Sequence, residues 1–143
     1  MGAREDVSGA VGAELLTAAG WQAEIVVVPD EQAQISAAIS AAAEAGVSLV
    51  VTTGGTGIGP RDVTPEATAP LLERQIPGIA EQIRHVGIDS LPQAMLSRGV
   101  AGICGRTLVV NLAGSTGAVR DGMPVVLDVA DHVVSQLAGG DHS

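Results

Sequence analysis

The 143-residue sequence has no phenylalanine, no tyrosine and no lysine, and it has a single tryptophan, Trp21. The absence of lysine excludes mechanisms that need a lysine amine, such as a Schiff base or a lysine–phosphate intermediate. The apolar residues are mostly alanine, valine, leucine and isoleucine. This composition suggests helices that pack closely on a sheet of β-branched residues. A chain of this length is expected to form one domain with a sizeable core.

Cys104 is the only cysteine, which excludes an intrachain disulfide and a cysteine-rich metal site. We expect its side chain to act as a small buried hydrophobe. No apolar run approaches the ~18 residues of a membrane-spanning helix, and no signal peptide is visible. We therefore expect a protein of the reducing cytoplasm that does not contact a membrane.

The formal net charge is −9, and all seven basic residues are arginines. Such an acidic chain is not expected to bind nucleic acid non-specifically. It can still bind a small anion where a few arginines converge with backbone amides. The three histidines, His85, His132 and His142, lie outside the motifs described below, and we expect them to be structural.

The segment 52–68 follows the apolar run 47–51 and holds four glycines, at positions 54, 55, 57 and 59. Glycine allows positive φ angles and a close approach of the backbone to a ligand. Successive exposed N–H groups in such a loop form a concave site for an anion. We therefore expect this loop to bind a phosphorylated ligand, although glycines that only turn the chain would give the same pattern. The spacing matches neither a Walker loop nor G-x-G-x-x-G.

Three side chains near the end of this loop add to the prediction. Arg61 offers a planar fork of donors that suits phosphate. Thr64 is expected to cap a helix whose first residue is Pro65. Asp62 would repel an anionic ligand, and a bound Mg²⁺ would remove that conflict. In a loop without a ligand, Asp62 would serve only as a second capping residue.

Helix and strand signals alternate along the chain. We expect strands at residues 23–28, 49–53, 100–103 and 107–111, and helices at residues 9–19, 30–45, 65–74, 79–86 and 123–137. Continuous apolar strands between helices predict an α/β fold of three layers, with a mostly parallel sheet flanked by helices on both faces.

In such sheets, ligands bind beyond the carboxyl ends of the strands. Three loops are therefore expected to meet there, at residues 29–31, 54–62 and 111–117. This arrangement would bring Asp30 and Asp62 together beside the glycine loop, where two carboxylates and phosphate groups can hold Mg²⁺. Taken alone, Asp30 is more simply explained as the N-cap of the helix that follows it.

The residues now point to a known family. The glycine loop reads Thr53-Gly54-Gly55-Thr56-Gly57, and residues 61–68 read Arg-Asp-Val-Thr-Pro-Glu-Ala-Thr. These two stretches resemble the signature of the MoaB/Mog family of molybdenum cofactor biosynthesis, which includes the G domain of gephyrin. The resemblance continues, in order, at residues 28–31, 76–78, 94–98 and 111–115. It covers nearly the whole chain, and the long motif is highly specific.

The resemblance implies a compact α/β domain that forms a cytoplasmic homotrimer and binds molybdopterin, a pterin phosphate with a dithiolene group. Active members of the family are nucleotidyltransferases. With Mg²⁺, such a molybdopterin adenylyltransferase converts molybdopterin and ATP into adenylyl-molybdopterin and pyrophosphate. A MoeA-type partner then uses the product for molybdate insertion.

Carried over to this sequence, the family's two aspartates are Asp30 and Asp62, which are expected to be catalytic and to hold Mg²⁺. Arg98 and the amides of the glycine loop are expected to hold phosphate oxygens, and Ser97 and Ser115 to supply hydroxyl donors. The full set of expected binding residues is Thr53, Gly54, Gly55, Thr56, Gly57, Arg61, Thr64, Ser97, Arg98, Asn111, Gly114 and Ser115.

Two departures from the family pattern affect the expected activity. The family has an apolar strand and a Val-Ser-Asp loop ahead of the segment that corresponds to residues 4–9, whereas here only residues 1–3 precede it. We therefore expect a single domain, residues 1–143, without the family's first strand. Residues 113–117 also lack the proline and the lysine that the family often has in this loop, and the missing lysine removes one phosphate contact.

Two other functions remain open. The chain could bind molybdopterin as a carrier or scaffold without transferring an adenylyl group, and the short N-terminus favours this, whereas the intact Asp30 and Asp62 favour the enzyme. It could also be an inert structural domain whose glycine loop only turns the chain. Binding without turnover would identify the first, and a melting temperature unchanged by Mg·ATP would favour the second.

Overall fold

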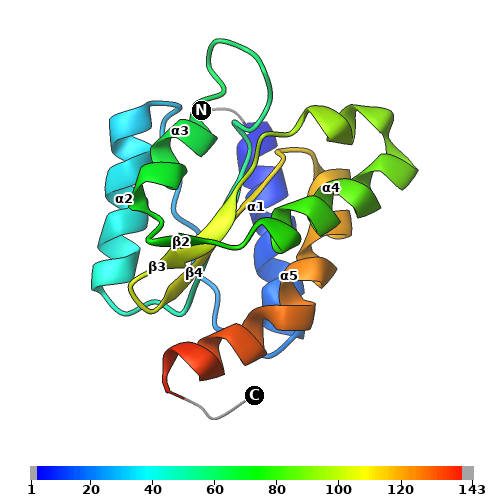
Figure 1. Cartoon of the computed structure of the whole chain (residues 1–143). Coiled ribbons are helices and arrows are strands. Elements are labelled where there is room, and N and C mark those ends of the chain that lie inside the picture. The colour runs from blue at the N-terminus through cyan, green and yellow to red at the C-terminus, as the bar shows by residue number, and fades with distance from the viewer. Residues whose placement is uncertain (1–2, 140–143) are drawn as a thin grey trace.

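The computed structural model describes residues 3–139 and shows a sheet with helices on both faces (Figure 1). The elements in chain order are α1 (Ala3–Ala18), α2 (Gln32–Glu44), β1 (Leu49–Thr53), α3 (Thr64–Thr68), the 3₁₀ helix η1 (Ala69–Leu71), β2 (Arg74–Gln75), α4 (Pro77–Ser90), the 3₁₀ helix η2 (Pro92–Leu96), β3 (Ala101–Cys104), β4 (Thr107–Leu112) and α5 (Thr116–Leu137). Helices α2 and α3 cover one face of the sheet, and α1, α4 and α5 cover the other. The expected α/β class and its three layers are confirmed. No helix in this part of the chain combines the length and the hydropathy that crossing a membrane requires.

The sheet has four strands in the order β1-β4-β3-β2. Strands β1 and β4 are parallel, with Leu49 opposite Leu108 and Thr53 opposite Leu112. Strand β3 pairs antiparallel with both β4 and β2. The described sheet is therefore mixed, whereas we expected it to be mostly parallel. The reason is the short turn at Gly105, because so few residues can reverse the chain but cannot make the crossover that parallel strands need.

The core lies between β4 and α5. Every residue of β4 is buried. Leu108, Val110 and Leu112 of this strand belong to the main apolar cluster, together with Val119 and Met123 of α5. Helix and strand approach closely at Gly122 of α5, where an added Cβ would lie 2.7 Å from Leu112 Cδ2. This agrees with the expectation of helices packed closely on a sheet of branched aliphatic residues.

Residues 23–28 do not form the buried strand that we expected. The segment 21–29 is irregular, and Ile25, Val26 and Val27 are 49%, 67% and 44% exposed. A β-branched sequence supplies side chains that suit a strand, but a strand also needs a neighbour to accept and donate its backbone hydrogen bonds. Among residues 3–139, none pairs with this segment.

Strand β1 is consequently an edge of the described sheet, and all five of its residues are only half-buried. A cavity of about 550 Å³ lies between the beginning of the irregular segment and the residues that lead into β1. Its lining includes Trp21, Val47 and Leu49, together with Asp131 of α5. Trp21 packs partly buried against the main apolar cluster at this point.

Four helices differ from the sequence prediction by more than two residues at one end or both. The helix expected at 9–19 runs from Ala3 to Ala18. The helix expected at 65–74 ends at Thr68 and continues as η1, because Pro70 has no N–H to continue the α-helical ladder. The helix expected at 79–86 runs from Pro77 to Ser90, with the proline at its first position, where no hydrogen bond is lost. The helix expected to begin at residue 123 begins at Thr116, since Ser115 caps it and Pro124 is tolerated inside it.

Candidate functional site

A cleft of about 380 Å³ opens where the chain leaves the carboxyl ends of β1 and β4. Three segments border it: the glycine loop after β1, the η2 region, and the loop between β4 and α5. The lining residues are Thr53, Gly54, Gly55, Thr56, Gly57, Asp62, Gln93, Leu96, Ser97, Ala113, Gly114 and Ser115. Two of the three loops that we expected to meet, the glycine loop and the loop after β4, therefore do so. The third, at residues 29–31, contributes no residue to the lining.

The glycine loop has a backbone that only glycine adopts readily. Gly54 and Gly55 have φ angles of 96° and 69°, in the left-handed region. At Gly55, an added Cβ would also lie 2.3 Å from Thr64 Oγ1, so there is no space for a side chain. At Gly114, an added Cβ would lie 3.0 Å from the Cα of Gly54, which shows how closely the two loops approach each other.

Asp62 folds back over the tip of the glycine loop and borders the cleft. Its Oδ2 accepts a hydrogen bond from the N–H of Gly59, with an N···O distance of 2.9 Å. No donor within residues 3–139 bonds to Oδ1. One oxygen of the carboxylate therefore fixes the side chain, and the other remains able to bind a ligand.

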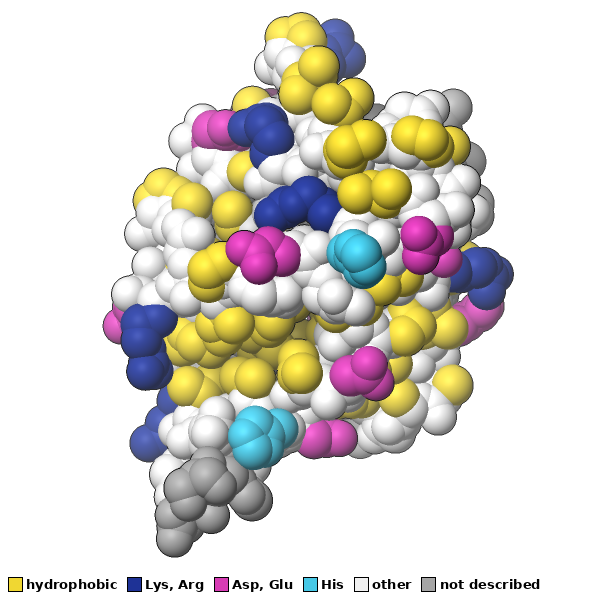
Figure 2. Space-filling model, turned by 45° about the vertical axis from the view of Figure 1, so that its right-hand side comes forward, with side chains coloured by type: hydrophobic (Ala, Val, Ile, Leu, Met, Phe, Trp, Pro, Cys, Tyr) yellow, Lys and Arg dark blue, Asp and Glu magenta, His cyan; other side chains and the backbone are white. Residues whose placement is uncertain are grey.

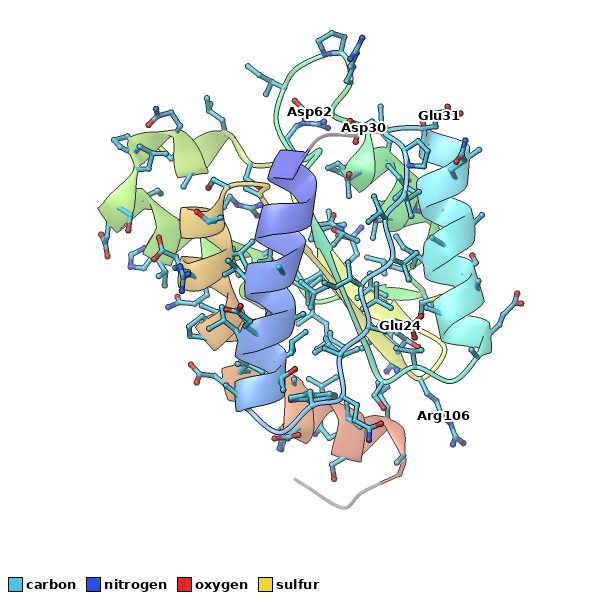
Figure 3. The ribbon with its side chains drawn as sticks, turned by 180° about the vertical axis from the view of Figure 1, so that it is seen from behind. Glu24, Asp30, Glu31, Asp62 and Arg106 are labelled. Atoms are coloured by element: carbon cyan, nitrogen blue, oxygen red, sulfur yellow. The ribbon has the colours of Figure 1, made fainter. Side chains whose placement is uncertain are left out.

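Asp30 lies at the same end of the molecule as Asp62, but it is not among the residues that border the cleft (Figure 3). It is exposed and stands at the end of the irregular segment, before α2. The N-cap of α2 is Glu31, without a side-chain cap, so the simple capping role that we considered for Asp30 is wrong. The helix starts two residues later than the sequence predicted.

The guanidinium of Arg98 hydrogen-bonds to the glycine loop and to α3. Its Nε donates to the carbonyl of Gly57 at 2.8 Å, and its Nη2 donates to the carbonyl of Asp62 at 2.8 Å. Nη1 and Nη2 also donate to the two carboxylate oxygens of Glu66, at 2.5 and 3.3 Å. The hydrogen bond to Arg98 lowers the pKa of Glu66, and the same bond raises the pKa of Arg98. Arg98 does not border the cleft.

Ser97 borders the cleft and bonds to the glycine loop. Its hydroxyl donates to Thr56 Oγ1 at 3.2 Å and accepts from the N–H of Gly99 at 3.3 Å. Behind it, Arg84 of α4 donates to the carbonyls of Ser97 and Gly99 at 3.2 and 3.0 Å. A second arginine therefore fixes the segment that carries Ser97. Because Thr56 Oγ1 accepts the bond from Ser97, its own hydroxyl hydrogen remains available to a ligand.

Asn111 is 3% exposed and lies beneath the cleft rather than in its lining. Its Oδ1 accepts from the N–H of Val100 at 3.1 Å, and its Nδ2 donates to the hydroxyls of Thr52 and Thr68 at 2.8 and 3.2 Å. These bonds use both amide hydrogens and the carbonyl oxygen. The side chain thus joins β1, α3 and the segment before β3.

The other two expected residues of the loop also lie outside the lining. Thr64 is 5% exposed and is the first residue of α3, whose N-cap is Val63, so its expected capping role is wrong. Arg61 is exposed near the tip of the loop.

Ser115 ends the loop after β4 and caps α5. Its Oγ accepts a hydrogen bond from the N–H of Ala118 at 3.0 Å. The 22-residue helix therefore directs its N-terminus, with unpaired N–H groups and the positive end of its dipole, toward the cleft. Helix N-termini of this kind bind phosphate and carboxylate groups.

Sequence reasoning missed Gln93 and Leu96, which border the cleft from η2, and the bracing roles of Arg84 and Glu66. Leu96 belongs to a segment with a family resemblance, but Gln93 carries no motif. The bracing bonds join residues far apart in the chain, and no local pattern indicates them. On the face drawn in Figure 2, the basic side chains are scattered among acidic and apolar ones and form no continuous basic surface.

Comparisons with known proteins identify the family of the chain. The model of the family described as probable molybdopterin binding domain matches residues 1–132. The molybdenum cofactor biosynthesis bifunctional protein of Chlorobaculum tepidum is 38% identical over 143 residues, which cover 99% of this chain and 46% of that protein. The molybdopterin adenylyltransferase of Haemophilus influenzae is 40% identical over 112 residues, which cover 78% of this chain and 57% of that enzyme.

Among solved structures, a molybdopterin biosynthesis protein from Mycobacterium abscessus superposes with a TM-score of 0.90 and 51% sequence identity. The match covers 94% of this chain and 86% of that one. The chain spans less than two thirds of the two curated relatives but most of this neighbour. Fold, cleft and family model therefore agree with the MoaB/Mog resemblance, and the chain belongs to the family of molybdopterin-binding domains.

Proposed function

We propose that the chain acts in molybdenum cofactor biosynthesis as a molybdopterin adenylyltransferase, which joins molybdopterin to the adenylyl group of ATP and releases pyrophosphate. The observation that carries the proposal is the convergence of the glycine loop, the N-terminus of α5 and the carboxylate of Asp62 on one cleft. A relative named for this activity is 40% identical over 112 residues, which supports the choice of reaction.

The phosphate groups of both substrates bind against backbone N–H groups. The loop that contains Gly54, Gly55 and Gly57 supplies one set, and the N-terminus of α5 supplies the other. Hydroxyl hydrogens on Thr56 and Ser115 add donors, because both oxygens accept bonds within the protein and leave their hydrogens unused. The remaining expected contacts are with Thr53, Arg61, Ser97 and Gly114.

Mg²⁺ fits the acidic residues of the site. Asp62 keeps Oδ1 without a donor, and Asp30 is an exposed carboxylate at the same end of the molecule. Within residues 3–139, no cluster of three or more histidine, cysteine or acidic side chains could hold a metal ion. Two carboxylates with phosphate oxygens and water are the usual set for Mg²⁺. When bound, the ion would neutralise negative charge on the triphosphate, and Asp30 and Asp62 would hold it.

The chain itself contributes to the reaction by positioning. An oxygen of the molybdopterin phosphate forms a bond to the α-phosphorus of ATP, while the bond from that phosphorus to the pyrophosphate oxygen breaks. The attacking oxygen is already ionised at neutral pH, so no side chain has to remove a proton. The cleft holds the two phosphates in line and stabilises the charge that develops on them, which is the main contribution of proteins to such transfers.

The proposal has further features, some of which rest on the family resemblance and others on the composition of the chain. The protein is a cytoplasmic homotrimer, and it passes adenylyl-molybdopterin to a MoeA-type partner that inserts molybdate. It contacts neither nucleic acid nor membrane, in keeping with the net charge of −9. Sedimentation of the purified chain would test the trimer directly.

A carrier or scaffold that binds molybdopterin without adenylylating it is the second candidate. The position of Asp30 favours it, since this carboxylate lies outside the lining of the cleft. A site that retains the glycine loop and the N-terminus of α5 would still bind a phosphate when one of its two acidic residues is not in place.

Adenylyl transfer by the purified chain separates the two candidates. The protein is mixed with molybdopterin, ATP and Mg²⁺, and pyrophosphate and adenylyl-molybdopterin are followed together. We expect product in molar excess over protein. Bound molybdopterin without pyrophosphate, from a chain that is folded by circular dichroism, would instead identify the carrier.

A further inference from the structure

Arg98 is the one side chain, within residues 3–139, that hydrogen-bonds to the loop tip 57–62 from outside that loop. The other bonds of the tip are local: Gly59 and Asp62 exchange two hydrogen bonds, from Gly59 N to the carboxylate and from Asp62 N to the carbonyl of Gly59. Local bonds fix the shape of the tip but do not join it to the rest of the molecule. Apart from its covalent links to the flanking residues, the hydrogen bonds that join the tip to the rest of the described chain come from Arg98.

The two carbonyls that Arg98 holds are the first and the last of the loop tip. Gly57 and Asp62 are bonded at 2.8 Å each, and the backbone N–H of Arg98 also donates to the carbonyl of Thr56 at 2.8 Å. Between the clamped ends, the chain turns outward and exposes 73% of Ile58. The guanidinium thus closes the base of the loop, and the side chain of Asp62 begins at one of its two anchor points.

Glu66 holds the guanidinium in the orientation that this clamp needs. The pair is bidentate, with each terminal nitrogen of Arg98 bonded to a different carboxylate oxygen. The side chains are 38% and 46% exposed, so the pair is worth little as a source of stability. The pair matters more for the orientation of the guanidinium. The carboxylate and the two carbonyls also occupy most of the donors of Arg98, so few remain for a phosphate.

From these contacts we propose that Arg98 is a positioning residue, which holds the carboxylate of Asp62 at the cleft by clamping the glycine loop, and that Glu66 orients it. This inference rests on the proposed function only for its kinetic consequences. It replaces the direct contact between Arg98 and a phosphate that the sequence suggested. Arg84, which holds the backbone of Ser97 and Gly99, supports the clamp from behind.

Kinetics distinguish a clamp from a phosphate ligand. The variant Arg98→Lys keeps the charge but cannot bond two carbonyls and a carboxylate at once. We expect kcat to fall about 10- to 100-fold and half-saturating Mg²⁺ to rise, as when a residue behind a metal ligand is lost. Binding of molybdopterin without Mg²⁺ and ATP should change less than about twofold.

Glu66→Gln gives the sharper contrast. If Arg98 were a phosphate ligand, removal of the competing carboxylate would tighten ATP binding. For a clamp, the variant shifts Mg²⁺ dependence in the same direction as Arg98→Lys, and the double variant is no worse than Arg98→Lys alone. Tighter ATP binding with unchanged Mg²⁺ dependence would overturn the inference.

Limited trypsin digestion tests the clamp even if the chain transfers no adenylyl group. Arg61 is exposed within the loop tip, so cleavage after it reports how freely the loop moves. We expect faster cleavage there in Arg98→Lys, at equal thermal stability. Arg106→Lys is the matched control, because Arg106 lies at the opposite end of the molecule from Asp62 (Figure 3). Equal cleavage rates in Arg98→Lys and Arg106→Lys would contradict the clamp, whatever the enzyme assay shows.

Discussion

The N–H of Gly54 donates a hydrogen bond to the carbonyl of Leu112, at an N···O distance of 2.8 Å. This bond continues the parallel pairing of β1 and β4 one step beyond the last paired residues. The two chains then diverge, one into the glycine loop and the other toward the cap of α5. The floor of the cleft is therefore an extension of the sheet, and its shape depends on residues that admit no side chain.

Gly55→Ala is expected to destabilise the fold. The methyl group would meet Thr64 Oγ1, and φ would have to stay at 69°, a conformation that alanine disfavours. We expect a loss of about 1–3 kcal/mol in the free energy of unfolding, measured by urea denaturation. Gly117→Ala is the matched control, since Gly117 has open space around its Cβ position and no positive φ. It should leave stability unchanged or raise it slightly.

Asn111→Ala is expected to destabilise the protein because it removes three hydrogen bonds at once. The N–H of Val100 loses its acceptor, and the hydroxyls of Thr52 and Thr68 lose the amide that donates to them. The hydroxyl of Thr68 keeps its own bond to the carbonyl of Thr64. We expect a loss of about 1–3 kcal/mol or more in the free energy of unfolding. Thr52→Val removes only one of these bonds and should cost about 1 kcal/mol. Equal losses in the two variants would show that Asn111 does not organise the network.

Asp62→Asn is expected to abolish turnover while molybdopterin binding remains largely intact. The amide can still accept the bond from Gly59, so the loop keeps its shape, but the negative charge that Mg²⁺ requires is lost. Adenylyl transfer and molybdopterin affinity are measured on the same sample. Asp128→Asn, an exposed substitution on α5, is the control for charge. Equal loss of binding and turnover would contradict the assignment of Asp62 to Mg²⁺.

The pair of Glu66 and Arg98 predicts a pH dependence of stability. Because Arg98 lowers the pKa of Glu66 in the folded state, the contribution of this pair is present above the ordinary pKa of glutamate. It is lost as the pH falls through the lowered pKa of the folded state. The difference in unfolding free energy between the protein and Glu66→Gln, which is small because both side chains are more than a third exposed, should therefore shrink further on acidification. Urea denaturation at neutral and acidic pH checks this, and a constant difference would contradict it.

Local sequence patterns predicted the structure correctly where the residues of one segment determine its conformation. The strand Leu49–Thr53 is predicted with its observed bounds, because an apolar run there ends at glycines that cannot continue it. The rule that ligands bind beyond the carboxyl ends of strands also predicted correctly that the loops after β1 and β4 meet. Both predictions depend on short-range signals and general geometry.

The same patterns failed where the outcome depends on distant residues. Residues 23–28 have the composition of a strand, yet they stay irregular because a strand needs a neighbouring strand to pair with, and none within residues 3–139 pairs with them. The partners of Arg98 lie 32 to 41 positions away along the chain, and those of Asn111 up to 59. No periodicity encodes such contacts. Sequence reasoning therefore identified residues near the cleft but not the division between those that line it and those that brace it.

The single tryptophan has a practical consequence. Because the chain has no tyrosine or phenylalanine, nearly all of its intrinsic fluorescence comes from the indole of Trp21. This ring packs against the core beside the cavity between the irregular segment and the residues that lead into β1. The lining of that cavity shares no residue with the candidate cleft. Its emission should therefore report loss of the fold without being altered by phosphate ligands in the cleft. It should also respond to any strand that pairs with the irregular segment beginning at this residue, so the protein carries its own optical probe of its open sheet edge.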